Sequence, residues 1–198
     1  MAELGLFSQV EAYALRELSP STGTSFSLEF KIALAIASVV AYTVLTQAGE
    51  ALEASGRIPH AGRWFHYLVG ASFGSLVLAP YVRAPHRLLR GVALAAAGAL
   101  IYYLAVRFVV DSPIGADAIT SFVLAGAGAA VLAGAAVVLI APQAYGARLF
   151  LLALLAGAAG GAAFDLKLAF DPSLVAGHAA WQALVCLALH FGLRPAPT

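Results

Sequence analysis

Seven polar side chains stand out in an otherwise apolar chain as candidates for chemistry. They are Glu50, His66, Arg107, Asp165, His178, Trp181 and Gln182. Of the 198 residues, 62% are hydrophobic and only 11% are charged, whereas soluble domains carry about 25% charged residues. Ionisable groups placed near the centre of a bilayer are costly and are usually functional. These side chains are therefore the candidate site.

The C-terminal apolar segment holds the strongest pattern. His178, Trp181 and Gln182 follow one another at spacings of three and one, so they share one face of a helix. Gln182 lies about two turns inside this segment, where lipid cannot satisfy its amide. We therefore expect Gln182 to point into a helix bundle, within reach of His66 and Asp165.

Two interpretations of these polar residues remain open. In the first, they form an interfacial belt in which Trp and Tyr anchor at the headgroups and Arg and Lys extend toward water. In the second, they line a cavity that opens to the outer leaflet and binds a ligand. In either case Asp165 needs a partner, and Arg107 is a candidate.

Catalytic chemistry is weakly indicated. A catalytic zinc site needs about three His or carboxylate ligands and an open position. His66 and His178 could form one with Asp165 or Glu50, so metal binding stays open. The pattern G-x-S-x-G occurs at Gly70-Ala71-Ser72-Phe73-Gly74, but it lies inside an apolar run rather than at the strand-to-helix turn of a nucleophile elbow, so it does not predict a serine nucleophile. The glycines lie in the predicted spans and form no phosphate-binding loop. We therefore assign no catalytic residue and no cofactor.

Six apolar runs approach the length of about 20 residues that a membrane-spanning helix needs. They are Phe30–Gln47, Trp64–Val82, Gly91–Val110, Ile119–Ala141, Leu149–Phe164 and Leu174–Leu193. None alternates as a barrel strand does. The sequence predicts an all-α polytopic membrane protein, with residues 1–198 forming a single bundle of six transmembrane helices. Residues 3–18 predict a short amphipathic helix that lies on the membrane surface.

Orientation follows from the basic residues between the spans. One side of the membrane receives seven of them, including the cluster Arg83, Arg87 and Arg90, and the other receives four. Both termini should therefore face the cytoplasm, in a bacterial inner membrane or another membrane that borders the cytoplasm. The net charge of +1 gives no indication of a nucleic-acid partner.

Small residues recur at helical spacing, as in Gly70-x3-Gly74 and Gly157-x3-Gly161, and as a ridge of Gly126, Ala130 and Gly134. Such residues let helix backbones approach closely. We expect tight packing within the chain, and a homo-oligomer contact is the alternative.

The stretch FDLKLAFDPSLVAGHAAWQALVCLALHF resembles the C-terminal part of the membrane hydrolase superfamily that includes the alkaline ceramidases and the progestin and adipoQ receptors (the CREST superfamily). There a His-Ala-x-Trp-His motif opens the last span, and both histidines bind zinc with a third from an early Ser-x3-His motif. Here the motif reads His178-Ala179-Ala180-Trp181-Gln182, and the early motif has Leu76 in place of histidine. The resemblance implies a degenerate, metal-free member in which only His178 is retained.

The number of spans and the basic connection PYVRAPHRLLR are similar to the Insig sterol-sensing family. Both resemblances imply a bundle that holds a lipid. We therefore predict a small integral membrane protein that binds or senses a lipid or other hydrophobic ligand, without catalysis. The alternatives are a metal-dependent membrane hydrolase and a transporter or channel, which would need a continuous polar path.

Overall fold

The computed structural model describes residues 26–82, 87–111, 118–140, 146–168 and 175–193, without the side chains of residues 63, 66, 87, 111, 118 and 165–168. These ranges contain the helices α2 (Leu28–Ala54), α3 (Ala61–Phe73), α4 (Arg87–Asp111), α5 (Ala118–Ile140), α6 (Ala147–Leu168) and α7 (Val175–Gly192). Five helices are long and apolar enough to cross a membrane, and a shorter apolar helix covers Tyr67–Tyr81. The all-α membrane bundle is thus confirmed. The predicted surface helix 3–18 lies outside the described residues.

Helix α2 begins at an N-cap and ends beyond the predicted span. The Ser27 side chain accepts a hydrogen bond from the Phe30 backbone N–H at 3.3 Å, which satisfies one free N–H of the first turn. The helix continues past Gln47 to Ala54. The chain then reverses, and the Glu53 carboxylate accepts a hydrogen bond from the Gly62 N–H at 2.9 Å. Helices α2 and α3 therefore form a hairpin.

The second predicted span, Trp64–Val82, is not one regular helix. A π-helix covers Gly74–Leu78 and a 3₁₀ turn covers Ala79–Tyr81. The cause is Pro80, which has no N–H to donate to the carbonyl one turn earlier and which clashes with a regular helix. The backbone widens instead, and the Ala79 N–H bonds to the Gly74 carbonyl.

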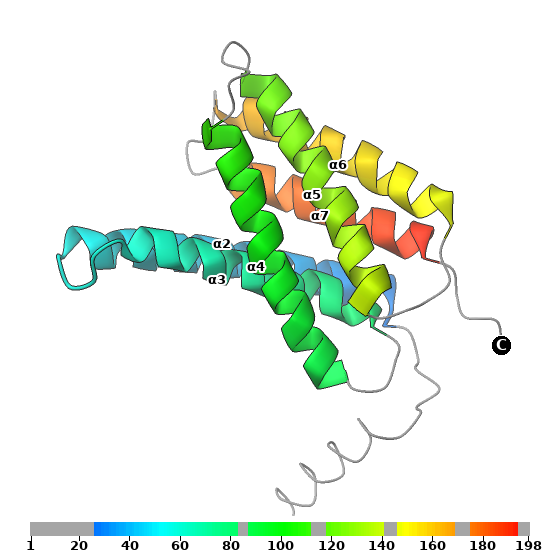
Figure 1. Cartoon of the computed structure of the whole chain (residues 1–198), viewed down its shortest axis with the longest axis horizontal. Coiled ribbons are helices and arrows are strands. Elements are labelled where there is room, and N and C mark those ends of the chain that lie inside the picture. Colours follow the sequence, from blue (N-terminus) through cyan, green and yellow to red (C-terminus); the bar gives the residue numbers. More distant parts are fainter. Residues whose placement is uncertain (1–25, 83–86, 112–117, 141–145, 169–174, 194–198) are drawn as a thin grey trace, which may run out of the picture.

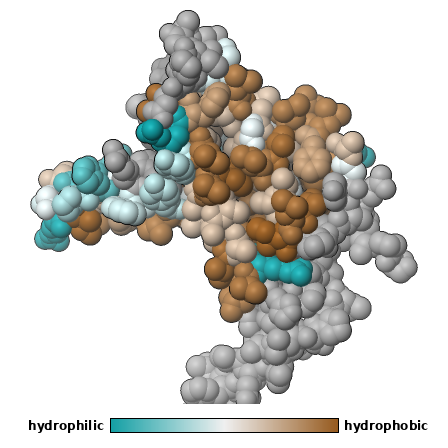
Figure 2. All heavy atoms as spheres, viewed as in Figure 1, coloured by the Kyte–Doolittle hydropathy of each residue, from teal (hydrophilic) through white to brown (hydrophobic). Residues whose placement is uncertain are grey.

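The six helices close into a ring. Each helix packs against the next in sequence from α2 to α7, and α7 packs back against α2. Figure 1 shows the α2–α3 hairpin crossed by α4, with α5, α6 and α7 grouped on one side. The far end of the hairpin projects away from this group, and Figure 2 shows that this end is hydrophilic, whereas brown, apolar surface covers much of the remainder.

Glycines bring two pairs of neighbouring helices into backbone contact. A Cβ on Gly70 of α3 would lie 2.7 Å from the Ala99 Cα of α4, and one on Gly74, in the π-helical turn that continues α3, would lie 2.8 Å from the Ala95 Cα. On α6, a Cβ on Gly157 would lie 2.9 Å from the Ala127 Cα, and one on Gly161 would lie 2.9 Å from the Val123 Cα of α5. A side chain at these positions would push the helices apart.

The end of the ring that holds the α2 N-terminus and the α7 C-terminus is filled. The Tyr81 hydroxyl donates a hydrogen bond to the Cys186 carbonyl at 2.6 Å. The buried Lys31 ammonium lies 4.2 Å from the centre of the Tyr81 ring, a favourable cation–π arrangement. Six further residues of the same cluster, each at most 1% exposed, are Val77, Leu78, Val137, Leu149, Val185 and Leu189.

Substitution of Gly157 or Gly161 by Ala should lower the free energy of unfolding by about 1–3 kcal/mol, because the new methyl group meets backbone atoms that cannot move independently. Gly128→Ala is the matched control on α5, since a Cβ there has nothing within 4 Å. It should be neutral or stabilising. Unfolding by a denaturing detergent measures all three, and equal stabilities would contradict the close α5–α6 contact.

Candidate functional site

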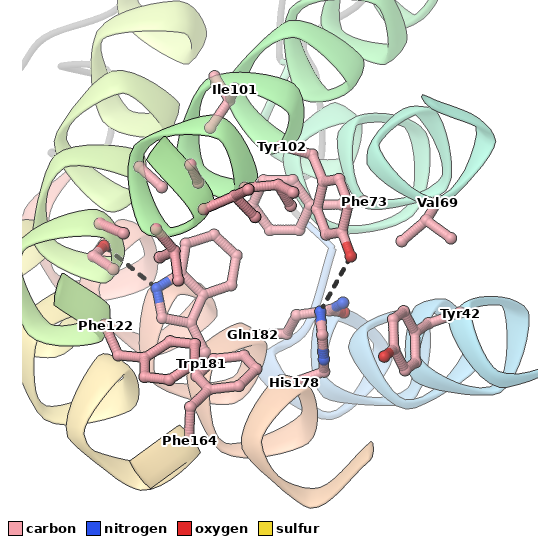
Figure 3. A pocket seen from close by; sticks show the side chains of 17 residues that line it. Tyr42, Val69, Phe73, Ile101, Tyr102, Phe122, Phe164, His178, Trp181 and Gln182 are labelled. Carbon is pink, nitrogen blue, oxygen red and sulfur yellow. Dashed lines mark hydrogen bonds between the residues drawn. The ribbon is translucent and has the colours of Figure 1, made fainter. Parts of the chain in front are cut away.

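The ring of helices encloses a cavity of about 310 Å³ to which all six helices contribute. Its lining consists of Tyr42, Val69, Phe73, Ile101, Tyr102, Ala105, Val106, Val109, Val110, Phe122, Ala125, Gly126, Ala129, Phe164, His178, Trp181 and Gln182. Figure 3 shows aromatic side chains from several helices around it. The cavity lies toward the C-terminal end of α4 and the N-terminal end of α7.

His178 is held among aromatic rings on the cavity wall. It is 8% exposed. Its ring stacks on Tyr42 of α2 with centroids 3.8 Å apart, and it meets Phe164 of α6 edge-on at 4.8 Å. The Tyr102 hydroxyl approaches His178 Nε2 at 3.5 Å, the long limit of a hydrogen bond (Figure 3). Contacts from three other helices therefore fix the imidazole.

Trp181 links α7 to α5 and α6. Its indole N–H donates a hydrogen bond to the Gly126 carbonyl at 3.2 Å, and its ring lies 5.0 Å from that of Phe73. A Cβ on Gly160 would lie 2.7 Å from the Trp181 Cα, so this glycine allows α7 to seat the indole beside α6. The N–H is satisfied inside the bundle rather than at the headgroups.

Gln182 follows His178 by one helical turn on α7 and is 3% exposed. It lines the cavity, and its Oε1 atom is buried without a hydrogen-bond partner. Buried carbonyl oxygens are almost always hydrogen-bonded in folded proteins. Gln182 therefore holds an unpaired acceptor at the cavity wall.

The other predicted site residues are placed differently. Glu50 and Arg107 are exposed and lie outside the described lining. Arg107 is outside because Tyr102, Ala105 and Val109 form the inward face of α4, and helical geometry puts the arginine on the opposite side of this helix. His66 lies on α3 and Asp165 on α6, but their side chains are outside the described residues. Contact of either with His178 or Gln182, and the Arg107–Asp165 pair, stay predictions.

An aromatic cluster on the outside of the bundle matches the geometry of an interfacial belt. The Trp64 and Tyr67 rings lie 6.1 Å apart, and Tyr67 stacks on Tyr103 at 5.7 Å. All three are exposed, and Arg107 follows Tyr103 by one helical turn. The polar residues of this end thus fall into two groups, one facing outward and one facing the cavity.

The cavity also contains aromatic residues that the sequence analysis did not select, chiefly Tyr42, Phe73, Tyr102 and Phe164. A signal for Tyr42 exists in the sequence, because Lys31, Ser38 and Tyr42 are spaced by seven and four residues in an apolar run and so share one helical face. The structure buries all three. No comparable signal distinguishes Tyr102 from its exposed neighbour Tyr103.

Among the residues described, no group of three or more His, Cys, Asp or Glu side chains could hold a metal ion. Comparison of the chain with family models, curated proteins and solved structures finds no match. The function is therefore argued from the cavity.

Trp181→Phe should lower the free energy of unfolding by about 1 kcal/mol, because it removes the indole N–H that bonds the Gly126 carbonyl and leaves that oxygen without this donor. Trp64→Phe is the matched control, since Trp64 is 64% exposed, and it should change stability by less than about 0.5 kcal/mol. Unfolding in mixed micelles measures both. Equal effects would show that the interhelical hydrogen bond contributes nothing.

Proposed function

We propose that this integral membrane protein binds a lipid or another membrane-dissolved hydrophobic molecule in the cavity enclosed by its six helices, as a binder or sensor and not as an enzyme. The observation that carries the proposal is the cavity itself, which has a mainly apolar lining and a few polar groups on one wall. Ligand pockets typically have this composition and size.

The packing around the cavity supports the proposal. Glycine contacts hold α3 and the turn that follows it against α4, and hold α5 against α6. The cavity is lined by residues from all four of these helices. A hydrophobic molecule from the bilayer would contact apolar side chains on each of them.

The exposed part of the cavity lining suggests an entry route. Val106 and Val110 line the cavity and are 37% and 70% exposed. Both lie in the last turns of α4, and both are apolar. A molecule dissolved in lipid could pass this rim without losing hydration of a polar group, so we propose lateral entry from the membrane.

The filled end of the ring favours binding over transport. Val77, Val137 and Leu189 lie on the side away from the cavity, and each is at most 1% exposed. A channel or transporter needs groups that replace water along its path. The described residues at this end are predominantly apolar. We therefore place the ligand in a pocket that ends within the bundle.

The hydrolase alternative depends on residues whose side chains are outside the described part of the chain. Of its proposed ligands, His178 lines the cavity and Glu50 does not. His178 makes ring contacts with Tyr42 and Phe164. No observation favours metal chemistry over binding, so this alternative stays a hypothesis, as does kinship with the ceramidase-like hydrolases.

Orientation is part of the proposal, with the cavity in the outer leaflet and both termini in the cytoplasm. The basis is the excess of Lys and Arg, seven against four, on the side of the termini. A reporter fused to the C-terminus should be active only in the cytoplasm, and one inserted at Gly56 in the α2–α3 turn should be active only outside. The reverse pattern would contradict the orientation.

Ala105→Phe should weaken ligand retention about fivefold or more, roughly 1 kcal/mol, because Ala105 lines the cavity and a phenyl ring would occupy it. Ala96→Phe is the matched control, since Ala96 is an exposed residue of the same helix. Native mass spectrometry of protein released from lipid nanodiscs measures the retained molecule. If Ala105→Phe and wild-type protein carry the same lipid load, the cavity is not the binding site.

A further inference from the structure

We propose that the ligand is a neutral lipid with a free hydroxyl group, and that this hydroxyl donates a hydrogen bond to Oε1 of Gln182. The inference rests on the proposed binding function and adds the chemical class of the ligand and its direction in the cavity. It excludes lipids whose buried end is purely apolar or only accepts hydrogen bonds.

The central observation is the state of the Gln182 amide. The residue is only 3% exposed, and it lines the cavity. Its Oε1 atom has no hydrogen-bond partner. A carbonyl oxygen accepts hydrogen bonds and donates none. The missing partner must therefore be a donor, which an ester, an ether or a hydrocarbon cannot supply.

Other polar groups lie on the same wall. The Tyr102 hydroxyl and His178 Nε2 are 3.5 Å apart and line the cavity with Gln182. Figure 3 shows the three side chains reaching toward one region from α4 and α7. A hydroxyl is suited to such a place because its oxygen can accept a hydrogen bond while its hydrogen is donated.

The rest of the lining sets the direction of the ligand. Ile101, Val109 and Ala129 cover other walls, and Val106 and Val110 form the exposed rim. An amphiphile therefore fits with its hydroxyl inward at Gln182 and its hydrocarbon part directed to the rim and the bilayer. This direction is opposite to that of a lipid in the membrane, whose polar end faces water.

The charge of the lining favours a neutral ligand. Among the described lining residues there is no Asp, Glu, Lys or Arg. A phosphate or carboxylate would be buried without a counter-charge, which is far more costly than burying a hydroxyl. A carboxylate would also place a second acceptor against the Gln182 oxygen. Phospholipid headgroups and ionised fatty acids are therefore poor ligands for this wall.

Tryptophan fluorescence provides the test, because the chain has two tryptophans and Trp181 lines the cavity whereas Trp64 does not. Trp64→Phe protein in phosphatidylcholine nanodiscs reports on the cavity through Trp181 alone. The probes are a dibrominated octadecanol and its methyl ether, which have the same chain and quenching bromines but differ in the donor hydrogen. The alcohol should quench at about tenfold lower mole fraction than the ether, equivalent to about 1.4 kcal/mol.

Two further variants isolate the role of Gln182. Adding Gln182→Leu to the Trp64→Phe protein should make the two probes equal. Adding Gln47→Leu, the same change at an exposed position of α2, should leave the tenfold preference intact. Trp181→Phe protein, in which Trp64 alone reports, should respond equally to both probes.

The outcomes separate the two proposals. If both probes quench Trp181 at the same low mole fraction, and more strongly than they quench Trp64, the cavity binds lipid but the hydroxyl inference fails. If neither probe quenches Trp181 more than Trp64, the proposed binding function fails with it. A preference for the alcohol that survives Gln182→Leu would assign the donor contact to another residue and would overturn the inference.

Discussion

The arrangement of this bundle depends on how closely its glycine-bearing helices approach. Lipid tails are as apolar as the helix surfaces, so association in the membrane relies on packing and interhelical hydrogen bonds more than on the hydrophobic effect. Gly74 and Gly98 bring α3 against α4, and Gly126, Gly157 and Gly161 bring α5 against α6. The ring closes where α7 packs on α6 and α2, and the cavity lies within this ring, lined by residues of all six helices.

The same small residues position the cavity walls. Gly160 accepts the Trp181 indole, and a Cβ on Gly177 would lie 2.7 Å from the Phe164 ring. Both glycines lie where α6 and α7 meet. Larger residues there would separate the helices and displace the two aromatic rings. The packing that holds the helices together and the lining of the proposed site are therefore one structural feature, and substitutions that loosen the bundle should also alter binding.

The fold class could be predicted from the sequence, because long apolar runs with few charged residues are what a helix needs to span a bilayer. The sequence was insufficient where tertiary contacts decide. Pro80 alone shows that the second span cannot be a regular helix to its end, but the prediction treated Trp64–Val82 as continuous. Glu50 and Arg107 share a membrane depth with His178, and depth does not determine the direction of a side chain. Their exposure follows from the rotation of α2 and α4, which only packing fixes.

Gln182 shows what a sequence can indicate about a site. Its depth in an apolar helix predicts that it faces the bundle, because an amide in hydrocarbon lacks partners. The partners could not be predicted from sequence, since they depend on the ring order that brings Tyr42 and Tyr102 beside His178. Within the described residues, the closed ring satisfies the Trp181 N–H and leaves the Gln182 oxygen unsatisfied. Trp181 and Gln182 are adjacent in the chain, yet only the first has its polar group paired inside the bundle, and this difference is the basis on which we propose a ligand.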